Sequence, residues 1–328
     1  DQAGFYTDSF TLFLTSPNTG DTILYTIDGS EPDINNTGGR FYTTKQDYAS
    51  TDTINKSYRT FIYTSSGILI KNRQSDTNKI SLIRPSPNWW TAPTTNINKN
   101  MVVRAVSYQT GAQKSKIETN SFFIDPAAEN RYSLPVVSIS TNEDNLFDYY
   151  SGIHVPGKFY YDYAPQGGYW PKITANYNRK GRAWERPAMI EYFDNQGNRS
   201  IAQNVGIRIA GNVSRGWARK SFRIYARSEY DTQKKLQYPF FDGLKKLGDP
   251  KKALSEFKRV TLRNSGTYWS EQLFQDAFCQ HTFKHIGVDV LHFSPSVVFV
   301  NGAYWGVMNF RQRIDDRYLK SHYGIQKE

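Results

Sequence analysis

The segment VGIRIAGNVSRGWARKSFRIYAR, residues 205–227, concentrates positive charge around a short polar loop. Its cations are Arg208, Arg215, Arg219, Lys220, Arg223 and Arg227. The loop itself is made of small and polar residues, among them Gly211, Asn212, Ser214 and Gly216. Such loops leave backbone N–H groups free to surround phosphate oxygens, and arginine can hold two oxygens at once. The segment therefore predicts either an anion site, with phosphate as the ligand, or a solvated hairpin.

The residues next to these cations predict which way the cations point. In a strand, alternate side chains share one face. Arg208 and Arg223 are each flanked on both sides by apolar residues. We therefore expect the arginines on one surface of a sheet, and the apolar residues of the same strands packed against a helix.

The whole chain of 328 residues is basic, with 41 Lys and Arg against 30 Asp and Glu and a formal net charge of +11. This charge favours anionic partners, namely nucleotides, acidic glycans, nucleic acid or acidic proteins, although it also serves solubility. The cations are spread along the chain rather than gathered in one stripe. That distribution disfavours nucleic acid as a partner.

Disulfide, metal and membrane chemistry have little support in the sequence. The single cysteine, Cys279, excludes an intrachain disulfide and lies in an amphipathic pattern that predicts its burial. No Cys/His cluster has zinc spacing, so no metal site is expected. Apolar runs are too short to span a bilayer, so no transmembrane segment is expected.

Residues 1–125 have the pattern of a β-sandwich, because short alternating runs are separated by frequent turn residues. Strands are expected within residues 9–16 and 23–32, and hairpins over residues 59–72 and 101–124. The loop over residues 84–100 contains Trp89 and Trp90, which could stack on sugar rings or cap a core.

Residues 126–133 are expected to link the sandwich to a second unit, residues 134–328, in which strands and helices mix. Strands are expected at residues 134–141, 187–194, 203–211, 219–227 and 257–264, helices at 143–150, 270–287 and 315–324, and a hairpin at 294–313. The 270–287 helix is expected to be capped by Ser270 and to bury an apolar face made of Leu273, Phe274, Ala277, Phe278 and Phe283. Asp315 and Asp316 begin a helix, which favours capping over metal binding.

The order of elements in the second unit is that of the small lobe of a protein kinase. With the loops set aside, three strands, the third carrying Lys220, precede a helix, a hairpin and a short helix. In kinases a strand lysine contacts the nucleotide phosphates and a helix carboxylate orients it. On this order Glu271 and Asp276 are the candidate partners of Lys220, and Asp276, which lies in one of the family-like segments quoted below, is the expected one. Tyr268, which follows a strand end, could stack on a nucleobase or pack on the helix start.

Three separated segments of the second unit resemble the spore-coat-protein CotH family of atypical, secreted kinases. They are GRAWERPAMIEYFDNQGNRSIAQNVGIRIAGNVSRGWARKSFRI, VTLRNSGTYWSEQLFQDAF and VVFVNGAYWGVMNFRQRIDDRYLKSHYG, and LPVVSIS resembles the opening strand of the family. The resemblance covers about residues 134–328. It implies an antiparallel small-lobe sheet with one packed helix, ATP and Mg²⁺ as cofactors, and phosphoryl transfer to Ser or Thr of a protein substrate.

Residues 4–124 resemble the immunoglobulin-like module at the C-terminus of chitobiase and β-hexosaminidase enzymes. The similar segments are GFYTDSFTLFLTS, ILYTIDGSEP and VVRAVSYQTGAQKSKIETNSFFI. The module is a non-catalytic β-sandwich, common in surface-exposed proteins. Together the two resemblances imply a secreted or cell-surface protein. The expected fold is mainly β: an immunoglobulin-like sandwich followed by an α+β domain similar to a kinase small lobe.

The chain also departs from the kinase family. Ala210 stands where the family has a histidine, Gln275 where it has an arginine, and Gln312 where it has an acid. The metal-binding aspartates of the family belong to a second lobe, downstream of the hairpin and its following helix. We therefore expect no catalytic and no metal-binding residue in this chain, and no phosphotransfer by residues 1–328 alone.

The sequence thus predicts the nucleotide-binding portion of a secreted CotH-like Ser/Thr protein kinase. The expected nucleotide-binding residues are Arg208, Asn212, Ser214, Arg215, Lys220, Tyr268 and Asp276. The alternative is a non-catalytic surface or adhesion protein with a degenerate kinase-like fold and a glycan as its partner.

Overall fold

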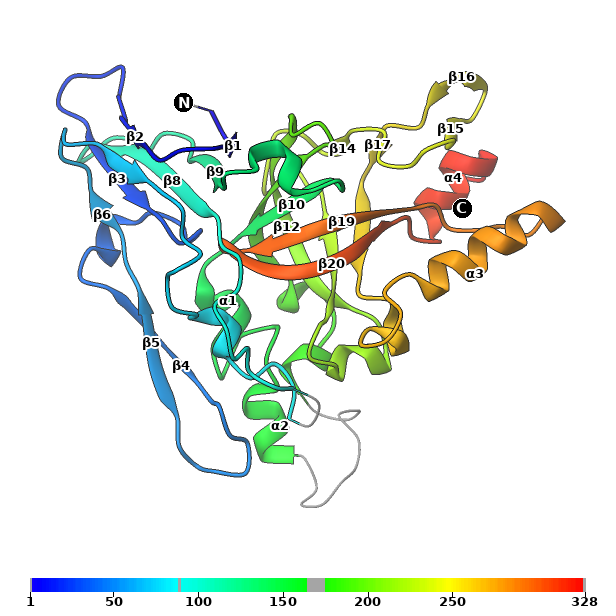
Figure 1. Ribbon diagram of the computed structural model, residues 1–328, viewed down its shortest axis with the longest axis horizontal. Coiled ribbons are helices and arrows are strands. Elements are labelled where there is room, and N and C mark those ends of the chain that lie inside the picture. The colour runs from blue at the N-terminus through cyan, green and yellow to red at the C-terminus, as the bar shows by residue number, and fades with distance from the viewer. Residues whose placement is uncertain (1, 88–89, 164–174, 327–328) are drawn as a thin grey trace.

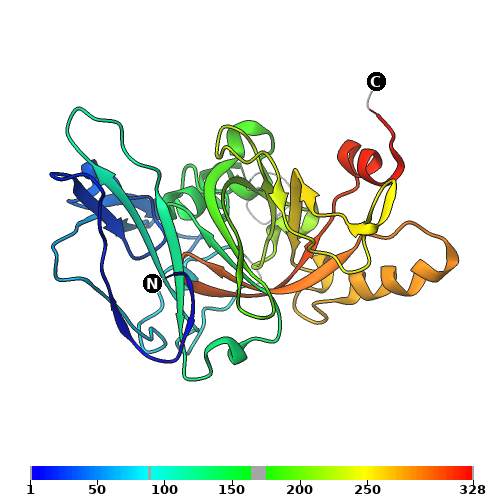
Figure 2. The same ribbon diagram turned by 90° about the horizontal axis from the view of Figure 1, so that it is seen from above.

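The computed structural model describes residues 2–87, 90–163 and 175–326. It places a group of small sheets, built from the first third of the chain, beside a closed β-barrel (Figure 1). Seen from above, two helices near the C-terminus project from the side of the barrel that faces away from those sheets (Figure 2). The protein is therefore mainly β, as the sequence predicts.

The first third of the chain forms one five-stranded sheet and two strand pairs. The sheet has the order β1–β9–β8–β3–β6, with β1 Gly4–Tyr6, β3 Thr22–Thr26, β6 Phe61–Ile62, β8 Met101–Tyr108 and β9 Glu118–Ile124. The pairs are β2 (Phe10–Leu12) with β7 (Ile68–Ile70), and β4 (Arg40–Thr44) with β5 (Ile54–Tyr58). An apolar cluster that includes Leu12, Ile70 and Phe122 lies among these strands.

The barrel closes through seven strands in the order β10–β11–β12–β13–β18–β20–β19. They are β10 Val136–Ser140, β11 Arg186–Phe193, β12 Arg199–Ala210, β13 Ser221–Tyr225, β18 Arg259–Arg263, β19 Phe293–Val300 and β20 Ala303–Arg311. Neighbours are antiparallel except β10 and β19, which run parallel. Four short strands belong to the same part of the chain: β14 Leu236–Gln237, β15 Lys245–Lys246, β16 Asp249–Ala253 and β17 Glu256–Phe257. Its α-helices are α1 Glu143–Phe147, α2 Gly157–Tyr163, α3 Gln275–Phe283 and α4 Asp316–Tyr323.

The strand alternation places the arginines as the sequence predicts, but the apolar residues pack differently. Ile207 and Ile209 of β12 and Phe222 of β13 are buried in the main apolar cluster, which lies within the barrel, and Arg208 and Arg223 are only partly buried. No described residue of the 270–287 helix belongs to this cluster, so the expectation that the apolar rows pack against that helix is wrong. A closed barrel turns one face of every strand toward the other strands, so the apolar rows pack on one another.

The helix α3 is shorter and more exposed than the sequence predicts. It begins after Phe274 rather than at Ser270, and of its expected apolar face only Ala277 is buried. Phe274, Phe278 and Phe283 are 60%, 60% and 54% exposed. Cys279 is also exposed, so its predicted burial is wrong. The barrel fills its own interior, so a helix outside it has no apolar sheet face on which to lie.

Two of the three expected hairpins are confirmed. β8 pairs with β9, and β19 pairs with β20 through Asn301 and Gly302, whose φ angles of +47° and +79° suit a two-residue hairpin turn. The hairpin expected over residues 59–72 is wrong, because β6 pairs with β3 and β7 pairs with β2. Each run is only two or three residues long, so its partner is decided by the core rather than by the turn.

Side chains from both parts of the chain share two apolar cores. Tyr42, Tyr58 and Ile83 belong to the main cluster, and Phe123 of β9 packs on Phe193 and Phe299 of the barrel, with ring centroids 5.4 and 5.2 Å apart. The segment that connects β9 to β10 contains one short 3₁₀ helix, Ala128–Arg131. That residues 1–125 fold alone, as an immunoglobulin-like sandwich, stays a prediction.

A buried carboxyl lies at this junction. Glu143, the first residue of α1, is 8% exposed and accepts a hydrogen bond of 2.8 Å from the Tyr42 hydroxyl. Burial raises the pKa of Glu143 to about 7, and the nearby Asp28 carboxylate adds to the increase. In the unfolded chain the same carboxyl titrates near its ordinary value. Folding therefore keeps a proton that the unfolded chain releases.

We predict that Glu143 makes the fold less stable as the pH rises. Between about pH 4.5 and pH 7 the unfolded carboxyl has lost its proton and the folded one retains it, so the free energy of unfolding falls across this window. Glu143→Gln removes the titration. Its unfolding free energy, relative to the original protein, should rise by roughly 2–3 kcal/mol between pH 5 and pH 8 in urea titrations. Parallel pH profiles for the two proteins would contradict this assignment.

Candidate functional site

Lys220, the expected phosphate ligand, is fully buried and is used by the fold. Its exposed fraction is 0%, and its Nζ donates hydrogen bonds to the carbonyl oxygens of Pro85, at 2.7 Å, and Trp217, at 2.5 Å. The ammonium also lies 4.4 Å from the centroid of the Tyr177 ring. Lys220 therefore joins the barrel to the loop that contains Pro85. The structure does not pair it with Asp276, so that expectation is wrong.

The loop after β12 is likewise tied to the protein. It forms a 3₁₀ turn, Val213–Gly216, in which Ser214 and Arg215 are buried, whereas Asn212, just before the turn, is exposed. The Arg215 guanidinium donates to the carbonyl oxygens of Gly211, at 2.7 Å, and Tyr177, at 2.9 Å. Burial lowers the pKa of Arg215 to about 10. β12 and β13 therefore pair as a hairpin, but its loop is packed against the protein rather than solvated, and phosphate binding by this loop stays a prediction.

The outer face of the barrel carries a row of arginines across four neighbouring strands. Arg208 of β12 pairs in register with Arg223 of β13, Arg223 with Thr261 of β18, and Thr261 with Arg311 of β20. Arg208 pairs with Glu185, whose Oε2 is 3.0 Å from the Arg208 Nε, and the same carboxylate also contacts Arg182 and Arg227. For Arg223, no ion pair is found among the residues that the structure describes.

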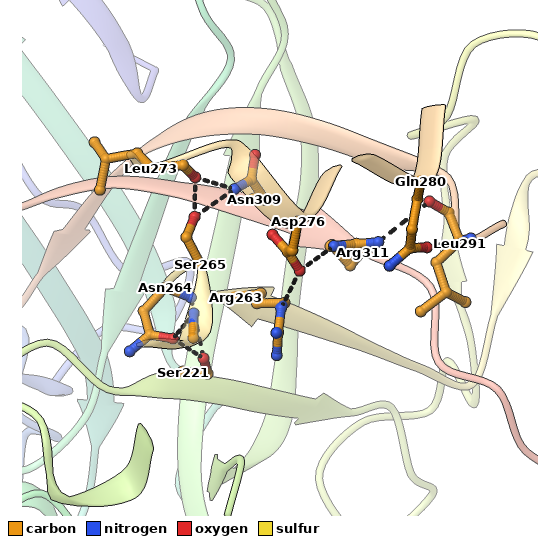
Figure 3. Close-up of polar contacts among 11 residues, drawn as sticks. Ser221, Arg263, Asn264, Ser265, Leu273, Asp276, Gln280, Leu291, Asn309 and Arg311 are labelled. Carbon is orange, nitrogen blue, oxygen red and sulfur yellow. Dashed lines mark hydrogen bonds and ion pairs between the residues drawn. The ribbon is translucent and has the colours of Figure 1, made fainter. Parts of the chain in front are cut away.

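At the end of this row, one carboxylate bridges two arginines from different strands (Figure 3). The Asp276 Oδ2, on α3, accepts from the Arg263 Nε of β18 at 2.5 Å and from an Arg311 Nη of β20 at 2.6 Å. The Arg311 side chain is 2% exposed, whereas those of Arg263 and Asp276 are 36% and 22% exposed. The three groups carry a net charge of +1 and are open to solvent on the Arg263 side.

A set of polar contacts holds α3 and the residues just before it against the barrel. The Asn309 amide of β20 donates to the Leu273 carbonyl at 2.7 Å and to the Ser265 hydroxyl at 3.2 Å (Figure 3). At the other end of the helix, the Gln280 side chain accepts from the Leu291 N–H at 2.9 Å. These contacts explain how a helix with an exposed apolar side can still hold Asp276 against the two arginines.

The remaining predicted residues have simpler positions. Tyr268 lies in the 3₁₀ turn Gly266–Tyr268 before α3 and is 43% exposed; its stacking on a base stays a prediction. Asp315 caps α4, accepting from the N–H groups of Arg317 and Tyr318, which confirms capping. Within the described residues, no three acids, histidines or cysteines are grouped as a metal site, and no helix is long and apolar enough to cross a membrane.

Part of the chain matches a known family. Residues 207–328 match the family model described as CotH kinase protein. No curated protein matches the chain. The matched region runs from β12 to α4 and includes the arginine row and Asp276. The match supports a kinase-like protein and leaves the likeness of residues 4–124 to an immunoglobulin-like module as a prediction.

Arg263 is the functional candidate that the sequence analysis missed. In kinases the cation is carried by the strand that directly precedes the helix. Here that strand is β18, not β13, and its last residue, Arg263, pairs with Asp276 of α3. The signal was present in the sequence, because FKRVTLRN is the last β pattern before the helix. The density of charge at residues 205–227 favoured β13 instead.

We predict that Lys220 stabilises the fold. Lys220→Ala leaves two buried carbonyl oxygens without their donor and opens a cavity, so the free energy of unfolding should fall by about 2–4 kcal/mol. Lys220→Met, which keeps most of the volume, should cost less. Urea denaturation of both variants, with exposed Lys71→Ala as the control, measures the effect. If Lys220→Ala unfolds at the same urea concentration as Lys71→Ala, this structural role is wrong.

Proposed function

We propose that the chain is the nucleotide-binding part of a kinase-like phosphotransferase, and that the arginine row on the outer face of the barrel binds the phosphates of ATP. The observation that carries the proposal is the ion pair between Arg263 and Asp276. A cation on the strand before a helix, oriented by an acid on that helix, is how protein kinases position the nucleotide phosphates.

The order of the strands supports the same proposal. In the barrel β20 lies between β18 and β19, although α3 and β19 separate β18 from β20 in the sequence. The connection that contains α3 therefore leaves the sheet at β18 and returns at β19, two strands away. This brings an acid from α3 over the ends of β18 and β20, where Arg263 and Arg311 meet it.

The charges at this site fit an anionic ligand. Asp276 contacts Arg263 only through Nε, which leaves the terminal nitrogens of the partly exposed guanidinium for other acceptors. One strand away, Arg223 adds a positive charge that no ion pair among the described residues offsets. Arginine binds phosphate oxygens two at a time, so Arg263 and Arg223 together suit a chain of phosphates.

In this proposal the residues of the chain bind and orient the phosphates. A Mg²⁺ ion bound to the nucleotide would supply the neutralisation of developing charge that phosphoryl transfer needs. Ser or Thr of a protein is the proposed acceptor, and a secreted or cell-surface location is the proposed setting. These finer points derive from the family resemblance described above. ATP binding without phosphoryl transfer would favour a non-catalytic role.

We predict that ATP binding depends on both members of the ion pair. Arg263→Ala removes a charge-assisted contact worth roughly 1.5–3 kcal/mol, which corresponds to about tenfold or more in affinity. Asp276→Asn should also weaken binding, because Arg263 loses its orientation. Calorimetric titration of Mg-ATP at fixed moderate salt measures both effects.

The sign of the Asp276→Asn effect separates two explanations. If general positive charge alone attracts ATP, removing a carboxylate should strengthen binding, since the site becomes more positive. Lys71→Ala, a remote and exposed cation, controls for net charge. The proposal is overturned if the original protein does not bind ATP, or if Arg263→Ala and Lys71→Ala bind it alike.

A further inference from the structure

A cavity of about 870 Å³ lies where four separate segments of the chain meet. They are the loop around residues 81–87 and 90–93, residues 217–219 just before β13, the turn before α3, and the start of β20. Arg223, Arg263, Arg311 and Asp276 do not line it. The cavity is therefore distinct from the proposed phosphate site.

Tryptophan dominates the wall of this cavity. Four of the seven tryptophans of the chain line it, namely Trp90, Trp217, Trp269 and Trp305. Each is only partly buried, so apolar ring surface remains open to the cavity. Trp305 is held rigidly, because its ring packs on His154 at 5.3 Å and Phe147 at 6.1 Å between centroids. Fixed aromatic rings bind a ligand at low entropic cost. Trp89, the other tryptophan of the loop, lies outside the described residues.

A cation without a carboxylate partner completes the wall. Arg219 lines the cavity and is half-buried, and no ion pair is found for it within the described part of the chain. The guanidinium lies against Gly306, where a Cβ atom would come within 2.6 Å of the Arg219 Cζ. Glu271, exposed at the edge of the cavity, provides a hydrogen-bond acceptor. The cavity thus offers flat apolar surfaces, an available cation and an acceptor.

We propose that this cavity binds an acidic oligosaccharide. The C–H faces of pyranose rings are flat and apolar, so they suit indole surfaces, and their hydroxyl groups suit Glu271 and the serine and threonine side chains of the wall. A carboxylate or sulfate on the sugar pairs with the planar fork of Arg219. A quaternary ammonium ligand would also favour tryptophan, but Arg219 repels it.

The test is retention on an array of immobilised oligosaccharides. The array carries uronic-acid, sialic-acid and sulfated members, each beside its neutral counterpart. The variants are Trp269→Ala, Trp90→Ala and Arg219→Ala. Matched controls outside the cavity are Tyr150→Ala, an exposed aromatic residue, and Lys71→Ala, an exposed cation. Thermal unfolding of every variant, and Trp269→Phe as a milder change, separate loss of binding from loss of fold.

The proposal expects the original protein and both controls to retain at least one acidic glycan. It expects Trp269→Ala and Arg219→Ala, while folded, to lose retention by tenfold or more, and the neutral counterparts to bind more weakly. It is overturned if no glycan is retained, or if the controls lose retention as much as the cavity variants. It is also overturned if Trp269→Ala abolishes Mg-ATP binding instead, which would assign the cavity to a nucleobase. Failure of ATP binding alone leaves the glycan result unaffected.

Discussion

The parallel pairing of β10 with β19 is the constraint on which the rest of the structure depends. It joins the first strand of the barrel to a strand more than 150 residues later, with Val136 opposite Val297 and Ile139 opposite Val300. Once the sheet is closed, one side of every strand faces an apolar interior and the other faces outward. The arginines of β12, β13, β18 and β20 are thereby gathered on one outer surface. No single strand could produce that cluster, because the members come from residues 208 to 311.

The same closure determines which cations can meet a ligand. Lys220 and Arg215 lie where the barrel contacts neighbouring loops, so carbonyl oxygens of the protein occupy their donors. Arg263 lies at the end of β18 with its side chain 36% exposed, and among the described residues its ion-pair partner is Asp276. Lys220, Arg215 and Arg263 carry the same charge. Their position relative to the barrel therefore decides whether each can contact a ligand.

Local features of the fold could be predicted from the sequence, and pairings between distant residues could not. The alternation of apolar and charged residues around Arg208 predicted that its side chain points outward, and the Asn301–Gly302 pair predicted the turn of the last hairpin. Asp276 was predicted to pair with a strand cation, but its partners, Arg263 and Arg311, come from two strands that become neighbours only in the folded barrel. The burial of Phe274 and Cys279 was predicted wrongly, because helical periodicity cannot reveal that the barrel is already filled. The tryptophan cavity is lined by four segments that are distant in the sequence, so the sequence alone could not predict it.

Arginine-directed chemical modification tests the phosphate-binding claim most directly, because it reports on individual side chains. A dicarbonyl reagent followed by mass spectrometry should label Arg263, which is partly exposed, and Arg40, whose side chain is 58% exposed, but not the buried Arg311. With Mg-ATP present, the account predicts strong protection of Arg263 and unchanged labelling of Arg40. Equal labelling of Arg263 with and without nucleotide would contradict it.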